Sequence, residues 1–219
     1  MTTMLRWLIR ISFTVAALCF AFVAFTCAEQ SHYRAAAGTL AAAVRTNAIS
    51  QPRLFESPVP APVPTTPHLE MINPVASAIV AAAPGLLGEL DVPQLRISTA
   101  IVEGDDATAL RRGAGHLRGT AMPGEAGNVV LAGHRDTVFR RLGELQRGDR
   151  LRLTTARGVF DYRVARTLRV GPSDTWVIRR SAAALTLITC YPFDWIGSAP
   201  ERWIVQAEPL ASEASGGKR

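Results

Sequence analysis

The stretch "LRLTTARGVFDYRVARTLRV" (Leu151–Val170) decides the fold class. Apolar and polar residues alternate through it on both sides of Arg157–Gly158, and this period of two is typical of strands with one buried face. The alternating apolar residues are Leu151, Leu153, Phe160, Tyr162 and Val164. A glycine between two such runs indicates a hairpin turn. We therefore predict an antiparallel hairpin.

Further runs of strand length lie on both sides of this hairpin. They are "LGELDVPQLRIS" (87–98), "TAIVEG" (99–104), "GNVVLAGHR" (127–135), "LTLITC" (185–190) and "RWIVQAE" (202–208). Only short helical patterns separate them, at 106–117 and 137–145. About eight short strands with small helices between them favour a closed or nearly closed β-barrel. We predict a mostly β domain over residues 86–210, with a disordered tail at 211–219.

The N-terminal region has a different character. "ISFTVAALCFAFVAFTCA" (Ile11–Ala28) has 18 residues without a charge, close to the length of about 20 residues that spans a bilayer. We predict a transmembrane anchor at 11–28 and a cytoplasmic N-terminus at 1–10, because Arg6 and Arg10 precede the apolar span. A cleaved signal peptide and a lipoprotein-type cleavage remain alternatives, although the bulky Phe25 suits neither.

A stalk is predicted between the anchor and the barrel, at residues 29–85. Residues 32–49 are rich in alanine and favour a helix. "PVPAPVPTTP" (58–67) contains five prolines in ten residues, which is typical of a semi-rigid polyproline II spacer. We expect the stalk to lift the barrel away from the membrane.

Charge argues against nucleic acid as a partner. The formal net charge is +6 and the isoelectric point is about 10.0, but the arginines are scattered and form no basic arm. Weak attraction to anionic surfaces is the simpler expectation.

Cysteine usage points to a reactive thiol. The chain has three cysteines, and Cys19 and Cys27 lie in the apolar span. Cys190 therefore has no partner for a disulfide within an exported domain, which flags a reactive thiol. The alternative is a buried cysteine that acts as a small apolar residue.

Three polar residues stand at predicted strand ends. His134 ends one strand, Cys190 ends another, and Arg202 opens a third. A histidine can take the proton of a nucleophilic thiol, and a guanidinium can stabilise a developing oxyanion. His116 is a rival histidine, but no apolar strand leads into it. One cysteine and two histidines in the domain do not suit a structural zinc site, which takes four ligands.

These residues carry a resemblance to a known family. "TLITC" (186–190) matches the TLxTC signature of sortases, the membrane-anchored cysteine transpeptidases of bacterial surfaces. "LAGHRDTVFRRL" (131–142) resembles the histidine segment of that family, and "CYPFDWIGSAPERWIVQAE" (190–208) resembles its cysteine-to-arginine segment. The "CYPF" continuation and the N-terminal anchor are most similar to class D sortases, including their Gram-negative relatives.

The resemblance implies an eight-stranded sortase-type β-barrel and a chemistry. Sortases cleave an LPxTG-like C-terminal sorting signal through an acyl-thioester on the cysteine, and an amine acceptor then resolves it. The resemblance implies Cys190 as nucleophile, His134 as general acid/base, Arg202 as the oxyanion or positioning group, and Thr189 as a substrate-binding residue. The expected partners are a secreted protein with the sorting signal and an amine of a wall precursor or protein.

The expected location is the cytoplasmic membrane, with one span and the catalytic domain outside. No cofactor is expected. Some class A sortases bind calcium, but nothing fixes Glu103, Asp105 and Asp106 as ligands here, so we expect no metal.

Two other functions remain open. One is an exported cysteine peptidase of peptidoglycan or protein, although papain-like enzymes place the cysteine before the histidine. The other is a non-catalytic cell-surface binding barrel, which leaves the lone thiol unexplained.

Overall fold

The chain was analysed as a computed structural model. The structure describes residues 2–50, 79, 81, 83–179 and 184–210. The proline-rich part of the predicted stalk and the predicted tail at 211–219 lie outside the described residues.

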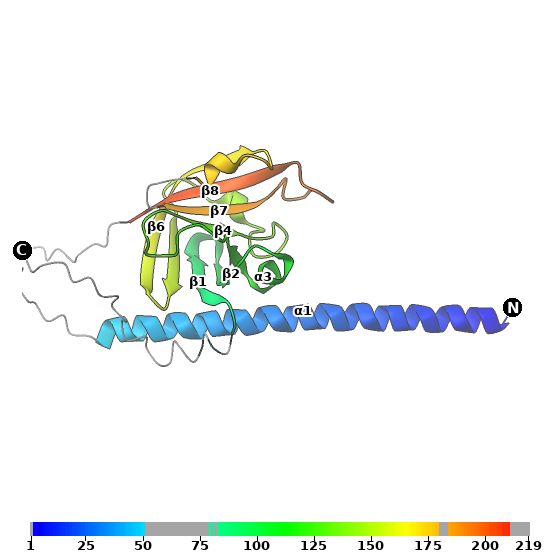
Figure 1. Cartoon of the computed structure of the whole chain (residues 1–219). Coiled ribbons are helices and arrows are strands. Elements are labelled where there is room, and N and C mark those ends of the chain that lie inside the picture. The colour runs from blue at the N-terminus through cyan, green and yellow to red at the C-terminus, as the bar shows by residue number, and fades with distance from the viewer. Residues whose placement is uncertain (1, 51–78, 80, 82, 180–183, 211–219) are drawn as a thin grey trace, which may run out of the picture.

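Eight strands close into a barrel, as predicted. Their bounds are β1 Leu86–Val92, β2 Ile97–Glu103, β3 Ala114–His116, β4 Asn128–Ala132, β5 Arg150–Thr155, β6 Gly158–Val170, β7 Ala184–Tyr191 and β8 Glu201–Pro209. The order around the barrel is β1-β2-β3-β4-β7-β8-β6-β5, and Figure 1 shows β7 and β8 on the side away from the long N-terminal helix.

The predicted hairpin forms β5 and β6. Leu151 pairs with Tyr162 and Leu153 pairs with Phe160, so the alternating apolar residues face one side. That side is the barrel interior, where Leu151 and Leu153 are fully buried among apolar side chains of the other strands. The period of two was sufficient to predict this pair because each strand presents every second residue to the core.

Two strand pairs in the barrel are parallel. These are β2 with β3 and β4 with β7. Parallel strands end at the same edge of a sheet, so the C-terminal ends of β4 and β7 lie together. This edge carries two of the predicted site residues.

The helices inside the domain are shorter than predicted. α3 covers only Ala107–Arg112, because the chain returns to the sheet at Gly113. A Cβ on Gly113 would lie 2.3 Å from the Ala100 carbonyl oxygen, so only glycine permits this close approach. The helical pattern at 137–145 forms turns and a 3-10 helix, η2 (Leu142–Glu144). Two further 3-10 helices are η1 (Pro93–Leu95) and η3 (Thr175–Val177).

One continuous helix, α1 (Thr2–Ser50), contains both the predicted anchor and the alanine-rich segment. Its N-terminal half projects past the barrel (Figure 1) and exposes large apolar side chains. Among them are Ile11, Phe13, Val15, Leu18, Phe20, Phe22, Val23 and Phe25. The most apolar window of 18 residues has a mean hydropathy of 2.2 and buries nothing, so this half is long and apolar enough to span a bilayer.

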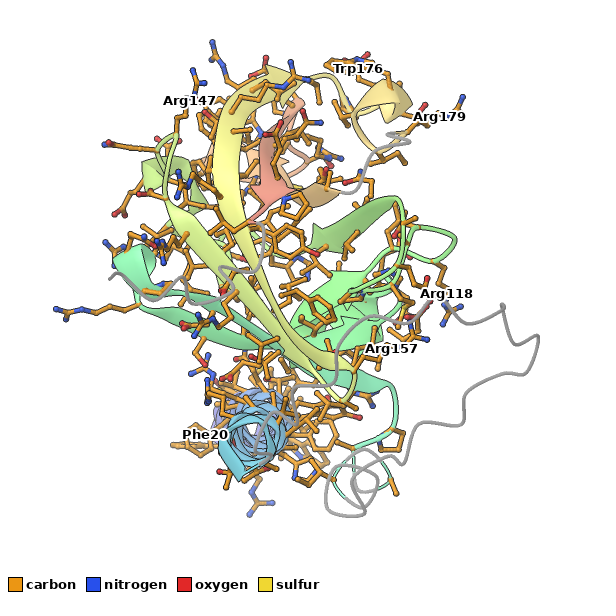
Figure 2. The ribbon with its side chains drawn as sticks, turned by 90° about the vertical axis from the view of Figure 1, so that its left-hand side faces the viewer. Phe20, Arg118, Arg147, Arg157, Trp176 and Arg179 are labelled. Carbon is orange, nitrogen blue, oxygen red and sulfur yellow. The ribbon has the colours of Figure 1, made fainter. Side chains whose placement is uncertain are left out.

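The C-terminal half of α1 packs against the barrel. Tyr33 and Leu40 are buried against Leu86, Val102 and Ala109, and Figure 2, viewed along the helix, shows α1 against one side of the barrel. Residues 29–46 therefore contact the domain that the predicted stalk was expected to hold at a distance. The helix packs against the barrel because this contact removes apolar surface from water.

Candidate active site

His134 lies just after β4 and Cys190 lies near the end of β7, at the same height along the barrel. Ala132 pairs with Ile188, and the Gly133 N–H donates to the Ile188 carbonyl at 3.0 Å. His134 and Cys190 each lie two residues beyond this pair. The parallel register therefore places both residues at the same end of the barrel, with His134 exposed and Cys190 partly exposed.

A side-chain hydrogen bond fixes this alignment. The Thr189 hydroxyl donates to the Gly133 carbonyl at 2.8 Å, and the Thr189 side chain is only 2% exposed. Thr189 thus ties together the residues that precede His134 and Cys190. In this structure its hydroxyl faces β4 rather than solvent, which favours a positioning role over direct contact with a substrate.

Position 133 has room only for glycine. A Cβ there would lie 2.5 Å from Phe139 Cδ2, and Phe139 is fully buried in the core. The Phe139 N–H also donates to the His134 carbonyl at 3.0 Å. The backbone that carries His134 is therefore packed tightly onto the core, which limits its movement.

Arg202 lies directly across from the cysteine. Cys190 pairs with Arg202 in the antiparallel β7–β8 ladder, and residues directly opposite each other on neighbouring strands point to the same face. The Arg202 Nη1 donates to the carbonyls of Ala199 at 3.2 Å and Glu201 at 2.9 Å. The guanidinium is thus held at the start of β8, on the same face as the thiol.

Arg135 holds the loop that follows Cys190, a contact that the sequence analysis missed. The Arg135 Nη2 donates to the carbonyls of Trp195 at 2.6 Å and Gly197 at 2.9 Å. Arg135 thus links the segment that follows β4 to the loop that follows β7. Its position next to His134 was the only sequence signal that could have indicated this role.

A shallow aromatic hollow lies beside the end of β7. Its volume is about 320 Å³, and the residues that line it come from η2 and the loop before it, from the end of β7 and the loop after it, and from β8. Tyr191 and Trp203 stack at 5.5 Å between ring centroids, and Phe193 meets Tyr191 edge-on at 5.7 Å. Tyr191 and Trp203 project from the face of the β7–β8 pair opposite to that of Cys190 and Arg202, because side chains alternate along a strand, and Cys190 is not among the residues that line the hollow.

His116 has a structural environment. The sequence analysis expected no strand before it, but it ends the short strand β3 and is only 2% exposed. Its Nδ1 lies 2.9 Å from the Glu103 carboxylate, and its Nε2 lies 3.0 Å from the Ala121 carbonyl. Both ring nitrogens are therefore engaged within the fold, which leaves neither open to a substrate.

The acidic residues considered for calcium have separate partners. Glu103 contacts His116. Asp106 caps α3, and the backbone N–H groups of Ala109 and Thr108 lower the pKa of its carboxyl. Within the described part of the chain, no group of three or more His, Cys, Asp or Glu residues is arranged to hold a metal ion.

The site can support acyl transfer by its composition. A thiol on β7, a guanidinium on β8 and an imidazole directly after β4 stand on or next to neighbouring strands. Such groups can supply a nucleophile, a proton carrier and an anion-stabilising donor. Elements of a closed barrel hold them more rigidly than free loops would.

Comparison with known proteins gives a consistent family. The family model of the sortase domain matches residues 90–210. Sortase D of Bacillus subtilis (strain 168) is 46% identical over 120 residues, which cover 54% of this chain and 61% of that protein. Sortase A of Listeria monocytogenes is 30% identical over 110 residues, or 48% of this chain and 49% of that protein. The chain thus matches less than two thirds of the length of these two curated relatives.

Solved structures give the same result. A Clostridium perfringens Sortase D5 transpeptidase superposes with a TM-score of 0.53 at 32% identity, covering 57% of this chain and 79% of that one. A Clostridium perfringens sortase C, solved with the C-terminal cell wall sorting motif, superposes with a TM-score of 0.53 at 29% identity, covering 57% and 71%.

Proposed function

Because this chain belongs to the sortase family, we propose that it is a membrane-anchored cysteine transpeptidase. It cleaves an LPxTG-like C-terminal sorting signal on a secreted protein and transfers that protein to an amine on the cell surface. The observation that carries this proposal is the placement of His134, Cys190 and Arg202 at one barrel end, on or directly after neighbouring strands.

Each residue has one role in the proposed reaction. The Cys190 thiolate attacks the carbonyl carbon of the scissile peptide bond, and Arg202 donates hydrogen bonds to the resulting oxyanion. His134 gives a proton to the leaving amine, and a thioester remains on Cys190. The acceptor amine then attacks the thioester, loses a proton to His134 and releases the thiolate.

Thr189 acts through its neighbours. Its hydroxyl holds the Gly133 carbonyl, so we assign it to the alignment of His134 with Cys190. The aromatic hollow beside β7 offers an apolar surface for part of the sorting signal.

A peptide assay tests the proposed function. A fluorogenic LPxTG-type peptide should be cleaved, and added amine nucleophiles should appear in the product in place of water. Mass spectrometry of the stalled enzyme should find the acyl fragment on Cys190. Cleavage in which water is the only acceptor would favour the exported peptidase, and a Cys190 that does not react with thiol electrophiles would favour the binding barrel.

Arg202→Lys should lower kcat/KM almost as much as Arg202→Ala does. Lysine keeps the charge but loses the planar fork of donors, and an oxyanion donor is worth about 10²–10³ in rate. Both variants should fold, because Arg202 is only partly buried. The measurement is kcat/KM on the sorting peptide, with circular dichroism as the folding check.

An exposed arginine outside the strands β4, β7 and β8 provides the control for this measurement. Arg179 is exposed, and Figure 2 shows it on the side of the barrel opposite α1. Arg179→Lys should leave kcat/KM within about twofold, since surface substitutions are usually mild. If folded Arg202→Lys keeps more than about half of the activity, the guanidinium does not have the proposed role.

The N-terminal half of α1 is proposed as an uncleaved single span of the cytoplasmic membrane, with the barrel outside. Its exposed apolar side chains have no packing partner among the described residues. Full-length protein should therefore remain in the membrane fraction after washing with high salt or alkali. A native chain that begins at residue 27, 28 or 29 would instead show a cleaved leader.

A further inference from the structure

A groove lies between α1 and the loop that follows His134. Its volume is about 540 Å³, within the range of ligand sites. Gln30 and Arg34 line it from α1, Arg96 from the turn after η1, and Arg140 and Arg141 from the loop after β4. We call this feature the arginine groove.

The arginine groove has unbalanced positive charge. Arg141 is paired with Glu144 at 2.6 Å, and this hydrogen bond lowers the pKa of the Glu144 carboxyl. Arg34, Arg96 and Arg140 are exposed, and no ion pair joins any of them to another described residue. The described residues that line the groove include no Asp or Glu. Three exposed arginines that line one groove, without an ion pair to any described residue, favour an anionic ligand.

The groove lies at the level of lipid headgroups if α1 spans the bilayer. The apolar span ends at Ala28, and Arg34 follows six residues later on the same continuous helix. At a rise of about 1.5 Å per residue this is about 9 Å along the axis. The headgroup layer extends about 5–8 Å beyond the hydrocarbon, so a long arginine side chain reaches it.

The candidate active site faces the same way. Figure 1 shows that β7 ends and β8 begins at the end of the barrel that faces the N-terminal half of α1. The loop between them exposes Trp195 at 49% and Ile196 at 95%, and such side chains suit a lipid interface. Arg140 and Arg141 line both the arginine groove and the aromatic hollow at the end of β7, so the two features are continuous.

We propose that the arginine groove binds the phosphate headgroup of an anionic phospholipid and that this contact seats the active-site end of the barrel on the membrane surface. The enzyme then acts on sorting signals and acceptors held close to the bilayer. This inference rests on the proposed membrane span, but it does not depend on the proposed chemistry.

Lipid binding to the full-length chain tests the proposal. The protein, in micelles of a neutral detergent, is mixed with dioleoylphosphatidylglycerol or with dioleoylphosphatidylcholine, and bound lipid is counted by native mass spectrometry. Wild-type protein should bind phosphatidylglycerol at least about tenfold more tightly, because each arginine near an anionic headgroup contributes roughly fivefold.

Two matched triple variants locate the site. The groove variant is Arg34→Gln/Arg96→Gln/Arg140→Gln, and it should bind phosphatidylglycerol less than about twofold more tightly than phosphatidylcholine. The control variant is Arg147→Gln/Arg163→Gln/Arg179→Gln, which has the same change in charge and should keep the wild-type preference. Figure 2 shows Arg147 and Arg179 on the side of the barrel opposite α1. The single variant Arg34→Glu lies on the exposed face of α1 and should lower the preference without disturbing the core.

Three results would overturn the proposal. One is a preference for phosphatidylglycerol that persists in the triple variant of the groove arginines. Another is an equal loss of that preference in the control triple variant, which would mean that the preference depends only on the net charge of the protein. The third is glycerol phosphate binding as tightly as phosphatidylglycerol, which would indicate a soluble phosphate ligand. A wild-type chain that shows no preference but is still found in the membrane fraction refutes only the role of the groove, whereas a wild-type chain released from that fraction refutes the span.

Discussion

Cys190→Ala is expected to abolish both peptide cleavage and amine transfer. Without sulfur no thioester can form, and neither His134 nor Arg202 can replace a nucleophile. Cys190→Ser should be almost as inactive, because a hydroxyl is far less acidic than a thiol and little of it ionises near neutral pH. The measurement is single-turnover cleavage of the sorting peptide, with mass spectrometry for the acyl-enzyme.

Folding should survive these substitutions. Cys190 is partly exposed and forms no disulfide, and the β7–β8 backbone pairing does not require its side chain. The melting temperature should therefore change by only a few degrees. Normal cleavage by folded Cys190→Ala protein would end the transpeptidase proposal.

His134→Ala is expected to lower kcat/KM by about 10²–10⁴. The register of β4 and β7 puts His134 and Cys190 at the same end of the barrel, where one imidazole is proposed to serve both proton transfer and stabilisation of the thiolate. The loss should appear mainly in kcat, since an exposed histidine at the barrel rim contributes little to substrate binding. Steady-state kinetics on the sorting peptide checks this.

The rival histidine supplies the control. His116→Ala removes a buried ring that contacts Glu103 and the Ala121 carbonyl, so it should cost about 1–3 kcal/mol of stability. Per folded molecule its activity should stay within about tenfold of wild type, far above that of His134→Ala. Thermal melts give the folded fraction. A larger loss of activity for folded His116→Ala than for His134→Ala would mean that His116 carries the chemistry.

Local sequence patterns were sufficient for the β5–β6 hairpin and for the apolar helix, but not for every strand. β3 (Ala114–His116) lies in a segment expected to be helical, and the run at 87–98 is divided by η1 (Pro93–Leu95) into most of β1 and the start of β2. Alternation over Leu151–Val170 placed the β5–β6 hairpin, because which residues face the core along a strand depends only on a spacing of two. The apolar span could also be predicted from the sequence, since its length and its lack of charge determine whether a helix can cross a bilayer. Helix ends were harder to place, and α3 stops at Gly113 because of a close backbone approach to Ala100.

The sequence also selected His134, Cys190 and Arg202 as candidates, through their places at strand ends and their resemblance to one family. It did not place them in space. His134 and Cys190 are 56 residues apart, and only the parallel pairing of β4 with β7 puts them at the same end of the barrel. That pairing depends on closure of the whole barrel, and the spacing of apolar residues along a strand does not determine which strand becomes its neighbour.

By itself, then, the sequence determined the strand faces, the apolar span and the residue types available for chemistry. Tertiary structure alone decided three other features. It buried His116 against Glu103 and it aligned Gly133 with Thr189. It also packed residues 33–44 of α1 on the barrel, so that Arg34, Arg96 and Arg140 line one groove. The physical reason is the same in each case: these contacts join residues far apart in the chain, and they form only when burial of apolar side chains in the closed barrel offsets the entropy of bringing distant segments together.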